Sequence, residues 1–334
     1  MRAAVTRIGG IEVADVGEPV PGPGQVLVRT LACGICGSDL HAAADLRRFA
    51  RLAAAASSGL GGGLDPERGV VFGHEFCAEI LEFGPGTQRE LAAGARVCSV
   101  PIVIGPDGPE GIGYSNRYPG GLAERMVLQE ALLLPVPDGL TSEQAALTEP
   151  LAVGEHAVNL ARLRGDETCV VVGCGPIGLA VIAALKERGH GPVIAADFSP
   201  VRRGLAERLG ADEVVDPAGG SAHGRGEVVF EAVGVPGVLG AIVREAQPRA
   251  RVVVVGVCME PDRIEPFHAI TKELELRFAF GYTREEFAAT LERLGRGGLP
   301  AEALVTEVVG LEGVAGAFAA LADPGRHGKV LVRP

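Results

Sequence analysis

The sequence predicts an α/β protein with two domains, one β-rich and one built on a doubly wound parallel sheet. Up to about Pro150, short β-rich runs alternate with glycine and proline turns, which is typical of antiparallel or mixed strands joined by loops. From Thr168 onward the pattern becomes apolar strand, glycine-rich turn and helix, which indicates βαβ units whose strands are buried on both faces. The length of 334 residues also favours two domains, since one domain holds roughly 150 residues.

Four segments of the first half are predicted to form strands. The turn Pro21-Gly22-Pro23-Gly24 precedes the first strand, and Gly84-Pro85-Gly86 ends the second. The expected strands are Gln25–Leu31, Glu79–Phe83, Ala95–Val100 and Glu124–Leu128.

Six segments of the second half are predicted to form a parallel sheet, with helices between the first three. Ser199 suits the N-cap of the second helix, Pro200 suits its first turn, and Gly210 follows its end. The expected strands are Thr168–Val172, Val193–Asp197, Val214–Asp216, Val228–Ala232, Val252–Val257 and Leu276–Gly281, and the helices are Ile177–Arg188 and Ser199–Leu209. Beyond Tyr282 we expect helices at Arg284–Leu294 and Leu311–Ala322 and a strand at Lys329–Val332.

The composition excludes several classes of protein. Hydrophobic residues make up 47% of the chain, which excludes intrinsic disorder. A formal net charge of −11 and an aromatic share of 4% argue against a nucleic-acid partner. No apolar run approaches the ~18 residues that span a bilayer, and no secretory signal begins the chain, so we expect a cytoplasmic protein without a membrane partner. The seven cysteines are expected to be reduced thiols, which makes them candidate ligands or nucleophiles.

A glycine-rich turn after the first parallel strand predicts a dinucleotide site. The segment Gly173-Cys174-Gly175-Pro176-Ile177-Gly178 has the spacing G-x-G-x-x-G and lies between a strand and a helix. Gly173 permits the tight turn, Gly175 lets a pyrophosphate approach the backbone, and Gly178 allows the helix to pack closely on the strand. The N-terminus of the helix offers unpaired N–H groups and the positive end of its dipole to the pyrophosphate.

An acidic residue at the end of the next strand indicates the kind of dinucleotide. Asp197 is placed to accept hydrogen bonds from both hydroxyls of the adenosine ribose, and its charge would repel a 2′-phosphate. NAD is therefore the expected cofactor, a preference that the nearby Arg202 and Arg203 weaken slightly.

Sulfur, imidazole and carboxylate side chains in the first half form a candidate metal site. A catalytic zinc takes three protein ligands of these kinds and keeps one position open for water or substrate. Cys36 and His74 could supply two ligands, and Glu75 or Glu149 could supply a carboxylate. Taken singly, such residues are more often a polar surface histidine or a cysteine packed in the core.

The motifs follow one another in a specific order. Cys36-Gly37-Ser38-Asp39-Leu40-His41 comes first, then Gly73-His74-Glu75, then Glu149-Pro150-Leu151, and last the glycine-rich turn. In this order and spacing, over essentially the whole chain, the sequence resembles the zinc-dependent medium-chain alcohol dehydrogenases, and residues 149–154 resemble their sorbitol and polyol dehydrogenase branch. The resemblance implies a GroES-like catalytic domain made of residues 1–150 and 283–334, and a Rossmann NAD-binding domain made of residues 151–282. Zinc and substrate are then expected in the cleft between the two domains.

The resemblance assigns roles to the metal-motif residues. Cys36 and His74 match the thiolate and imidazole ligands, and Glu75 matches the carboxylate beside them. Glu149 lies where the family places a third ligand, so Glu75 and Glu149 exchange, or one of them ligates only through water. Asp39 matches a residue that orients the imidazole of His74.

The resemblance also assigns residues to proton and hydride transfer. Ser38 and His41 match a relay that carries the alcohol proton to solvent through the nicotinamide ribose. Ile177 and Val255 match apolar residues that hold the nicotinamide ring, and Lys329 matches a cation that contacts the pyrophosphate.

The expected reaction is the reversible oxidation of a secondary alcohol or polyol to a ketone by NAD, with zinc as the Lewis acid. Two alternatives remain open. One is a zinc-independent NAD(P)H-dependent reductase of quinones or enones with the same fold, against which Cys36, His74 and the two glutamates argue. The other is a non-catalytic NAD-binding protein, against which Ser38 and His41 argue.

Three further features set expectations for the whole chain. The stretch Cys98–Gly121 holds one cysteine where many relatives carry four for a structural zinc, so we expect one zinc per chain. The segment 42–72 looks longer than in compact relatives, and both a lid over the substrate and an ordinary surface insertion fit it. The strand Leu276–Gly281 is expected at an edge of the sheet, where the resemblance implies pairing between subunits and hence a homodimer or homotetramer.

Overall fold

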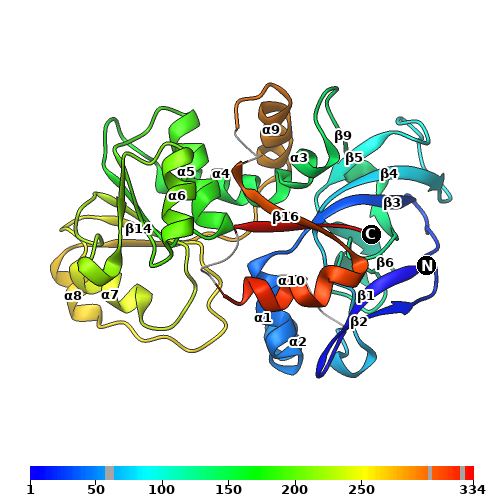
Figure 1. Cartoon of the computed structure of the whole chain (residues 1–334), viewed down its shortest axis with the longest axis horizontal. Helices are drawn as coiled ribbons and strands as arrows, with labels where there is room; N and C mark the ends of the chain where they lie inside the picture. Colours follow the sequence, from blue (N-terminus) through cyan, green and yellow to red (C-terminus); the bar gives the residue numbers. More distant parts are fainter. Residues whose placement is uncertain (57–63, 300–302, 324–327) are drawn as a thin grey trace. The chain divides into compact units, whose positions relative to one another are not determined.

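The computed structural model describes residues 1–56, 64–299, 303–323 and 328–334. The chain forms two compact units (Figure 1). The first unit consists of Met1–Glu149, Glu307–Ala322 and Lys329–Pro334, and the second consists of Pro150–Thr306 and Asp323–Gly328.

This division differs from the expected one on the C-terminal side, because residues 283–306 and 323–328 belong to the second unit rather than the first. The physical reason is the contact between helix α4 (Thr148–Ala161) and helix α9 (Arg284–Gly295). The carboxylate of Glu286 accepts a hydrogen bond from Asn159 Nδ2 at 2.7 Å and lies 2.9 Å from His156 Nδ1.

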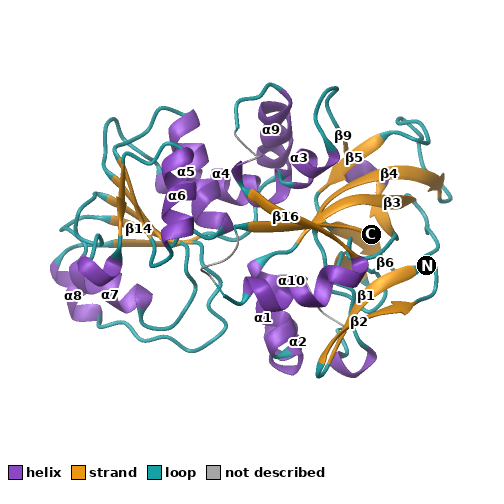
Figure 2. Cartoon of the chain, in the orientation of Figure 1, coloured by secondary structure: helices purple, strands orange, loops and turns teal. Residues whose placement is uncertain are grey.

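The second unit is built on a six-stranded parallel sheet (Figure 2). The strand order is β12-β11-β10-β13-β14-β15, so the chain starts in the middle, winds to one edge and then winds to the other. This is the doubly wound order of a Rossmann domain, and it confirms the predicted fold class. All six predicted strands are present, and their ends differ from the predicted ones by three residues or fewer. The strands are β10 (Cys169–Val172), β11 (Val193–Ala196), β12 (Glu213–Val215), β13 (Val228–Glu231), β14 (Arg251–Val254) and β15 (Glu275–Phe278).

Helices cover this sheet and explain its apolar strands. Every residue of β10, β11, β13 and β14 is buried, as expected of parallel strands with helices on both faces. Helix α5 (Pro176–Glu187) packs on β10 and β11, and α6 (Pro200–Arg208) packs on β11 and β12. Helix α7 (Val238–Glu245) packs on β13 and beside α8 (Pro266–Thr271).

The first unit holds a seven-stranded sheet and two hairpins. Strands follow the order β16-β17-β3-β4-β5-β9, and β8 pairs with β3. The strands of the sheet are β3 (Gln25–Gly34), β4 (Glu75–Phe83), β5 (Arg96–Ser99), β8 (Arg125–Gln129), β9 (Leu133–Pro135), β16 (Val305–Gly310) and β17 (Lys329–Arg333). The hairpins are β1 (Arg2–Arg7) with β2 (Gly10–Asp15), and β6 (Ile102–Gly105) with β7 (Gly108–Gly111).

Four α-helices of the described residues belong to the first unit. Residues Leu46–Ala55 form helix α2, and Asp45 caps it by accepting a hydrogen bond from Arg48 N. Residues 57–63, within the segment 42–72 that fits either a lid or a surface insertion, lie outside the described residues. The helices are α1 (Gly37–Ala44), α2 (Leu46–Ala55), α3 (Ser142–Ala146) and α10 (Val314–Leu321). Across the described ranges, no helix is both long and apolar enough to span a bilayer.

Candidate active site

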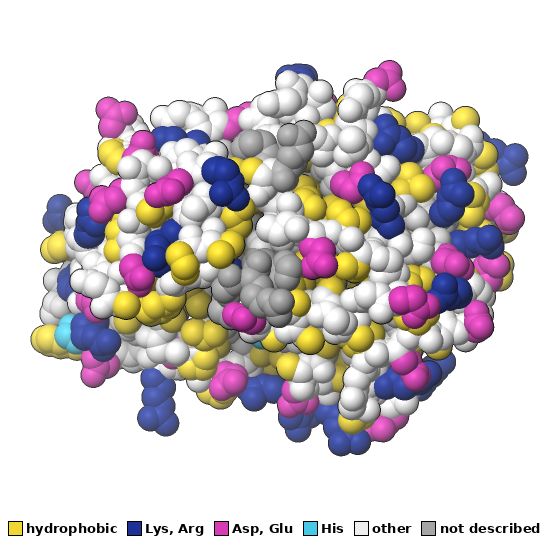
Figure 3. Space-filling view, in the orientation of Figure 1, with side chains coloured by type: hydrophobic (Ala, Val, Ile, Leu, Met, Phe, Trp, Pro, Cys, Tyr) yellow, Lys and Arg dark blue, Asp and Glu magenta, His cyan; other side chains and the backbone are white. Residues whose placement is uncertain are grey.

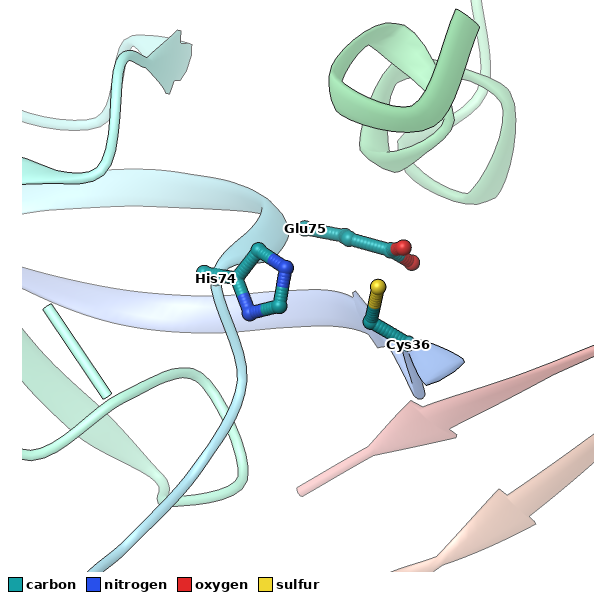
Figure 4. Close-up of side chains that lie close together, drawn as sticks. All are labelled: Cys36, His74 and Glu75. Atoms are coloured by element: carbon teal, nitrogen blue, oxygen red, sulfur yellow. The ribbon is translucent and has the colours of Figure 1, made fainter. Parts of the chain in front are cut away.

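Neighbouring strands of the first unit bring the metal-motif residues together. Strands β3 and β4 are antiparallel, and their register pairs Gly34 with Glu75. Cys36 lies two residues beyond Gly34, and His74 directly precedes Glu75, so the two motifs meet at one end of this strand pair. The Cys36 sulfur, a ring nitrogen of His74 and a carboxylate oxygen of Glu75 all lie within 4.8 Å of one another. Figure 4 shows the three groups around one small space.

Helix α1, which the sequence analysis did not predict, fixes the position of Cys36. Gly37, Ser38 and Asp39 have weak helix propensity, but Asp39 Oδ2 accepts a hydrogen bond from Cys36 N at 3.0 Å and so satisfies a donor at the helix start. Ser38 and His41 are three residues apart on α1 and therefore lie on neighbouring parts of its surface. Both are partly buried.

Asp39 also faces His74, as the resemblance implied. Asp39 Oδ1 lies 3.4 Å from His74 Nδ1. The other ring nitrogen, Nε2, faces the side on which Cys36 lies (Figure 4). Burial would lower the pKa of His74, but the charge of Asp39, followed by that of Cys36, outweighs burial and raises this pKa well above its ordinary value.

The donor set fits a zinc ion. Thiolate, imidazole and carboxylate are ligands of catalytic zinc, and bond lengths of about 2.0–2.3 Å put the ligand atoms of a tetrahedral site roughly 3.3–3.8 Å apart. The ligand atoms of the three groups, all within 4.8 Å of one another, lie close to this spacing. His74 and Glu75 are buried and Cys36 is partly buried, so few water molecules compete for the ligand atoms.

Glu75 has a second partner that the sequence analysis did not foresee. Lys329 Nζ at the start of β17 lies 2.7 Å from each carboxylate oxygen of Glu75 and donates to Ile35 O at 3.1 Å. The side chains of both ion-pair partners are buried. Lys329 was expected to contact the pyrophosphate, but the structure instead pairs its charge with Glu75 inside the first unit.

Glu149 does not belong to the group of three. It is buried in the first turn of α4, and the group that the structure brings together holds Glu75 as its carboxylate. Burial would lower the pKa of Lys329, but the charges of Glu75, Cys36 and, less strongly, Glu149 raise it above its ordinary value. Glu149 therefore lies within electrostatic range of Lys329, and the choice between Glu75 and Glu149 as the direct ligand stays a prediction.

Tyr114 is a residue of this site that no motif indicated. Its hydroxyl lies 2.7 Å from Ser38 Oγ and donates to Asp39 Oδ1 at 3.0 Å. Its ring lies 5.2 Å from the ring of His74, measured between centroids, and also contacts Phe49 and Phe72. Burial and the charge of Asp39 raise the pKa of Tyr114 well above its ordinary value, so the hydroxyl keeps its proton at neutral pH.

The glycine-rich turn of the second unit has the geometry that its spacing predicted. Gly173 has a φ of +93°, a left-handed conformation that favours glycine. A Cβ on Gly178 would lie 1.9 Å from Gly173 O, so only glycine allows α5 to approach β10 this closely. A Cβ on Gly175 would meet no atom nearer than Arg202 Nη1 at 3.9 Å, so the space above this residue is open to a ligand. Pro176 is the first residue of α5. Ile177 is the second residue of this helix, and it is partly buried.

Asp197 follows β11 and holds the turn in place. Its Oδ2 accepts from Cys174 N and its Oδ1 accepts from Ser199 N, both at 2.8 Å. Each oxygen retains a second lone pair for a ribose hydroxyl. Arg203 is engaged elsewhere, because its Nη1 donates to Asp197 O at 2.7 Å and lies 3.1 Å from the Asp216 carboxylate.

Val255 lies directly after β14, at the same edge of the sheet. It is buried, and its N–H donates to Glu231 O at 2.8 Å. The carboxyl ends of β10, β11 and β14 thus carry the residues expected to bind the dinucleotide, at the edge where open parallel sheets bind ligands.

Comparison with known proteins adds independent information. Residues 22–138 match the family described as alcohol dehydrogenase GroES-like domain, and residues 176–296 match the family described as zinc-binding dehydrogenase. The (R,R)-butanediol dehydrogenase of Bacillus subtilis is 34% identical to this chain, over 97% of this chain and 96% of its own length. The sorbitol dehydrogenase of the same species is 28% identical, over 93% of this chain and 91% of its own length.

Solved structures agree with these sequence matches. The crystal structure of 2R,3R-butanediol dehydrogenase from Bacillus subtilis matches with a TM-score of 0.83 and 31% identity, and the match covers 100% of this chain and 99% of that one. An alcohol dehydrogenase from a Thermus species matches with a TM-score of 0.84 and 25% identity, over the same shares of the two chains.

Proposed function

The chain belongs to the zinc-binding alcohol dehydrogenase family, and we propose that it oxidises a secondary alcohol or a polyol to a ketone with NAD+ as hydride acceptor. The observation that carries the proposal is the meeting of Cys36, His74 and Glu75 from two segments of the first unit. This donor set suits zinc, and the matched relatives include butanediol and sorbitol dehydrogenases.

Cys36, His74 and Glu75 would hold the zinc ion. Zinc bound there supplies Lewis acidity, which lowers the pKa of a hydroxyl group beside it. Asp39 orients the ring of His74 through Nδ1, and Lys329 balances the charge of Glu75.

Ser38 and His41 would take the alcohol proton away. The hydroxyl of Ser38 can accept a proton on a lone pair while it releases its own hydrogen to the next acceptor. His41 follows one turn later on α1, and its partly buried imidazole would pass the proton on to solvent.

The turn 173–178 and Asp197 would bind NAD+, whose nicotinamide ring accepts the hydride. The free N–H groups at the start of α5 suit the pyrophosphate. The carboxylate of Asp197 suits the two ribose hydroxyls and disfavours a 2′-phosphate, which supports NAD over NADP. Ile177 and Val255 would border the nicotinamide.

The proposal is tested by following NADH formation with zinc-loaded and chelator-stripped protein. The substrates are 2,3-butanediol, sorbitol, xylitol, cyclohexanol and benzyl alcohol, each with NAD and with NADP. We expect zinc-dependent turnover of secondary alcohols with NAD, and loss of turnover in the variant His74→Ala. Reduction of enones or quinones by metal-free protein would contradict the proposal and favour the zinc-independent reductase. Tight NAD binding without turnover of any substrate would favour a non-catalytic protein.

We also propose that the chain forms a homo-oligomer through the edge of its parallel sheet. Strand β15 is the last strand in the sheet order, and an open apolar edge promotes pairing with another strand. Phe278 on β15 is 68% exposed, and Phe267 and Ile270 on α8 are 71% and 73% exposed. Figure 3 shows hydrophobic side chains at the surface near α8, at the lower left.

Sedimentation at micromolar concentration tests this assembly. We expect a dimer or tetramer, and we expect Phe278→Glu to shift the population toward monomers because the charge would be buried at the interface. The variant Ile104→Glu is the matched control, since it adds the same charge at an exposed apolar position of the first unit. A wild-type protein that sediments only as a monomer would refute the assembly.

A further inference from the structure

The carboxylate of Glu231 holds the loop that follows its own strand. Glu231 is the last residue of β13, and its side chain is buried. Its Oε1 accepts hydrogen bonds from Val233 N at 2.8 Å and from Gly234 N at 2.9 Å. Burial raises the pKa of Glu231, although these two hydrogen bonds act in the opposite direction. Burial of a carboxylate is unfavourable unless it is hydrogen-bonded, and here both donors belong to the backbone of one loop.

The main chain of Glu231 holds a second loop. Its carbonyl oxygen accepts from Val255 N at 2.8 Å and from Gly256 N at 2.9 Å, directly after the end of β14. The two loops also touch each other, because a Cβ on Gly256 would lie 2.3 Å from Gly234 N and 2.8 Å from Glu231 Oε2. One residue therefore links the segments 233–235 and 255–257.

The linked loops present apolar side chains at the carboxyl edge of the parallel sheet. Val233, Val235 and Val257 are exposed there, and we call these three residues the valine surface. Val233 also lies against the glycine-rich turn, since a Cβ on Gly173 would lie 2.7 Å from Val233 Cγ2. The valine surface is thus continuous with the turn that suits a pyrophosphate.

The strand order indicates which half of a dinucleotide would meet the valine surface. Strands β11, β10, β13 and β14 follow one another in the sheet. In the proposed function, the turn after β10 binds the pyrophosphate, and Asp197 after β11 binds the adenosine ribose. The other half of the dinucleotide then extends to the opposite side of β10, over the ends of β13 and β14. This half carries the nicotinamide ring, whose flat face suits an apolar surface.

We propose that Glu231 is a positioning residue that holds the segments 233–235 and 255–257 together as one surface for the nicotinamide half of the dinucleotide. The inference rests on the proposed function, in which the chain binds NAD. Because its side chain is buried, Glu231 acts through the backbone that it holds. Without the carboxylate, Val233 N and Gly234 N lose their acceptor, and the loop is no longer fixed in this position. The adenosine half keeps its contacts, since Asp197 and the turn hold it.

The experiment compares Glu231→Ala with the matched control Glu227→Ala in the zinc-loaded full chain. Glu227 directly precedes β13, at the other end of the same strand, and its Oε2 accepts from Thr168 N at 2.8 Å. Both variants therefore remove a carboxylate that binds backbone N–H groups. Titration measures the Kd of NADH and the Kd of ADP-ribose, which lacks the nicotinamide.

We expect Glu231→Ala to raise the Kd of NADH about tenfold, because two backbone donors lose their acceptor and the loop moves. The Kd of ADP-ribose should stay at the wild-type value. Glu227→Ala should leave both values unchanged. A variant that is merely less well folded would bind both ligands more weakly, so the ratio of the two Kd values separates a positioning role from a structural one.

Two further variants test the same contact in other ways. Glu231→Gln keeps an oxygen that can accept from Val233 N and Gly234 N, so it should restore most of the affinity for NADH. Gly256→Ala disturbs the contact from the second loop, since the added Cβ would crowd Gly234 N, and it should weaken NADH binding alone. Thermal unfolding shows which variants are folded, and Gly256→Ala decides the question if Glu231→Ala does not fold.

Two results would overturn the inference about Glu231. They are an equal loss of affinity for NADH and ADP-ribose in Glu231→Ala, and an unchanged Kd of NADH in that variant. If the wild type binds neither ligand, the proposed function is wrong and the role of Glu231 fails with it. If the wild type binds both ligands and Glu231→Ala binds NADH equally well, the dinucleotide site stands and only the role of Glu231 is refuted.

Discussion

Lys329 is buried beside Glu75, and the two charges depend on each other. Each oxygen of the Glu75 carboxylate lies 2.7 Å from the ammonium group, and both side chains are almost inaccessible to water. Removal of one partner from such a pair leaves an uncompensated buried charge, which costs about 3–5 kcal/mol. The pair is therefore a stability element of the first unit as well as part of the candidate zinc site.

We expect Lys329→Met to lower the free energy of unfolding of zinc-free protein by about 3–5 kcal/mol, measured by urea denaturation. Zinc should restore part of this loss, since a cation bound by Glu75 replaces the missing charge. The matched control is Lys186→Met, which removes a partly exposed partner of Asp212 and should cost no more than about 1 kcal/mol. If zinc raises the free energy of unfolding of Lys329→Met no more than it raises that of the wild type, Glu75 is not the direct ligand.

Single residues differ in how well the sequence predicts them. The glycines of the turn and Asp197 are predictable because their functions depend on local spacing along one strand, turn and helix. Tyr114 and Lys329 are not, because their partners are 75 and 254 residues away in the chain. Only the register of the sheet and the path of the loops bring such residues to the site.

Among the secondary-structure elements, helix α9 depends on a carboxylate at its N-terminus. Glu286 accepts from Thr283 N at 2.8 Å and from Asn159 on α4, and it also faces His156. Burial would raise the pKa of Glu286, but the hydrogen bonds from Thr283, Asn159 and His156 outweigh burial and lower this pKa. The ionised form is thus the one that holds α9 against α4.

This arrangement predicts a pH dependence of stability. Because the pKa of Glu286 is lower in the folded state, its contribution is present above the pKa of the unfolded chain and is lost as the pH falls through the folded value. We expect Glu286→Gln to lower the free energy of unfolding by about 1–2 kcal/mol at neutral pH and by less near pH 4.

Urea unfolding of both proteins at the two pH values measures this difference. The control Glu273→Gln removes an exposed charge beside Arg249 and should leave the pH dependence unchanged. An equal loss of stability at both pH values in Glu286→Gln would mean that the ionised carboxylate is not what stabilises the helix contact.

The elements that the sequence predicted share one property, a periodic apolar pattern. The parallel strands and α5 carry continuous or helical apolar runs. The ends of these elements in the structure lie within a few residues of the predicted ends. The hairpin of β6 and β7 was missed because β7 consists of Gly108–Gly111, a segment without strand propensity. Helix α1 was missed because its first turn depends on a side-chain hydrogen bond rather than on periodicity.

At the scale of the whole molecule, the number of candidate ligand groups predicts how many metal ions each chain binds. In the parts of the chain that the structure describes, Cys36, His74 and Glu75 form the one group of ligands close enough to share an ion. The stretch 98–121 contains a single cysteine, Cys98, whose buried thiol donates to Ala145 O at 3.2 Å.

We therefore expect one zinc per chain in metal-replete protein. Elemental analysis after removal of loosely bound metal measures the stoichiometry, and Cys36→Ser should reduce it to nearly zero. The control Cys98→Ser should retain the full amount, since that thiol is not among the ligands. Two firmly bound zinc ions per chain in the wild type would contradict the expectation.

The sequence order of the first unit has a consequence for how the protein is made. Cys36, His74 and Glu75 leave the ribosome early, but Lys329 follows Glu75 by 254 residues, after the whole second unit. At translation rates of about 5–20 residues per second, this interval lasts roughly 13–50 s. Throughout that time the nascent chain contains the three candidate ligands but lacks the lysine that neutralises Glu75, and β3 lacks its neighbour β17. Zinc that binds during synthesis would meet an unpaired carboxylate, whereas zinc that binds after release must share Glu75 with Lys329.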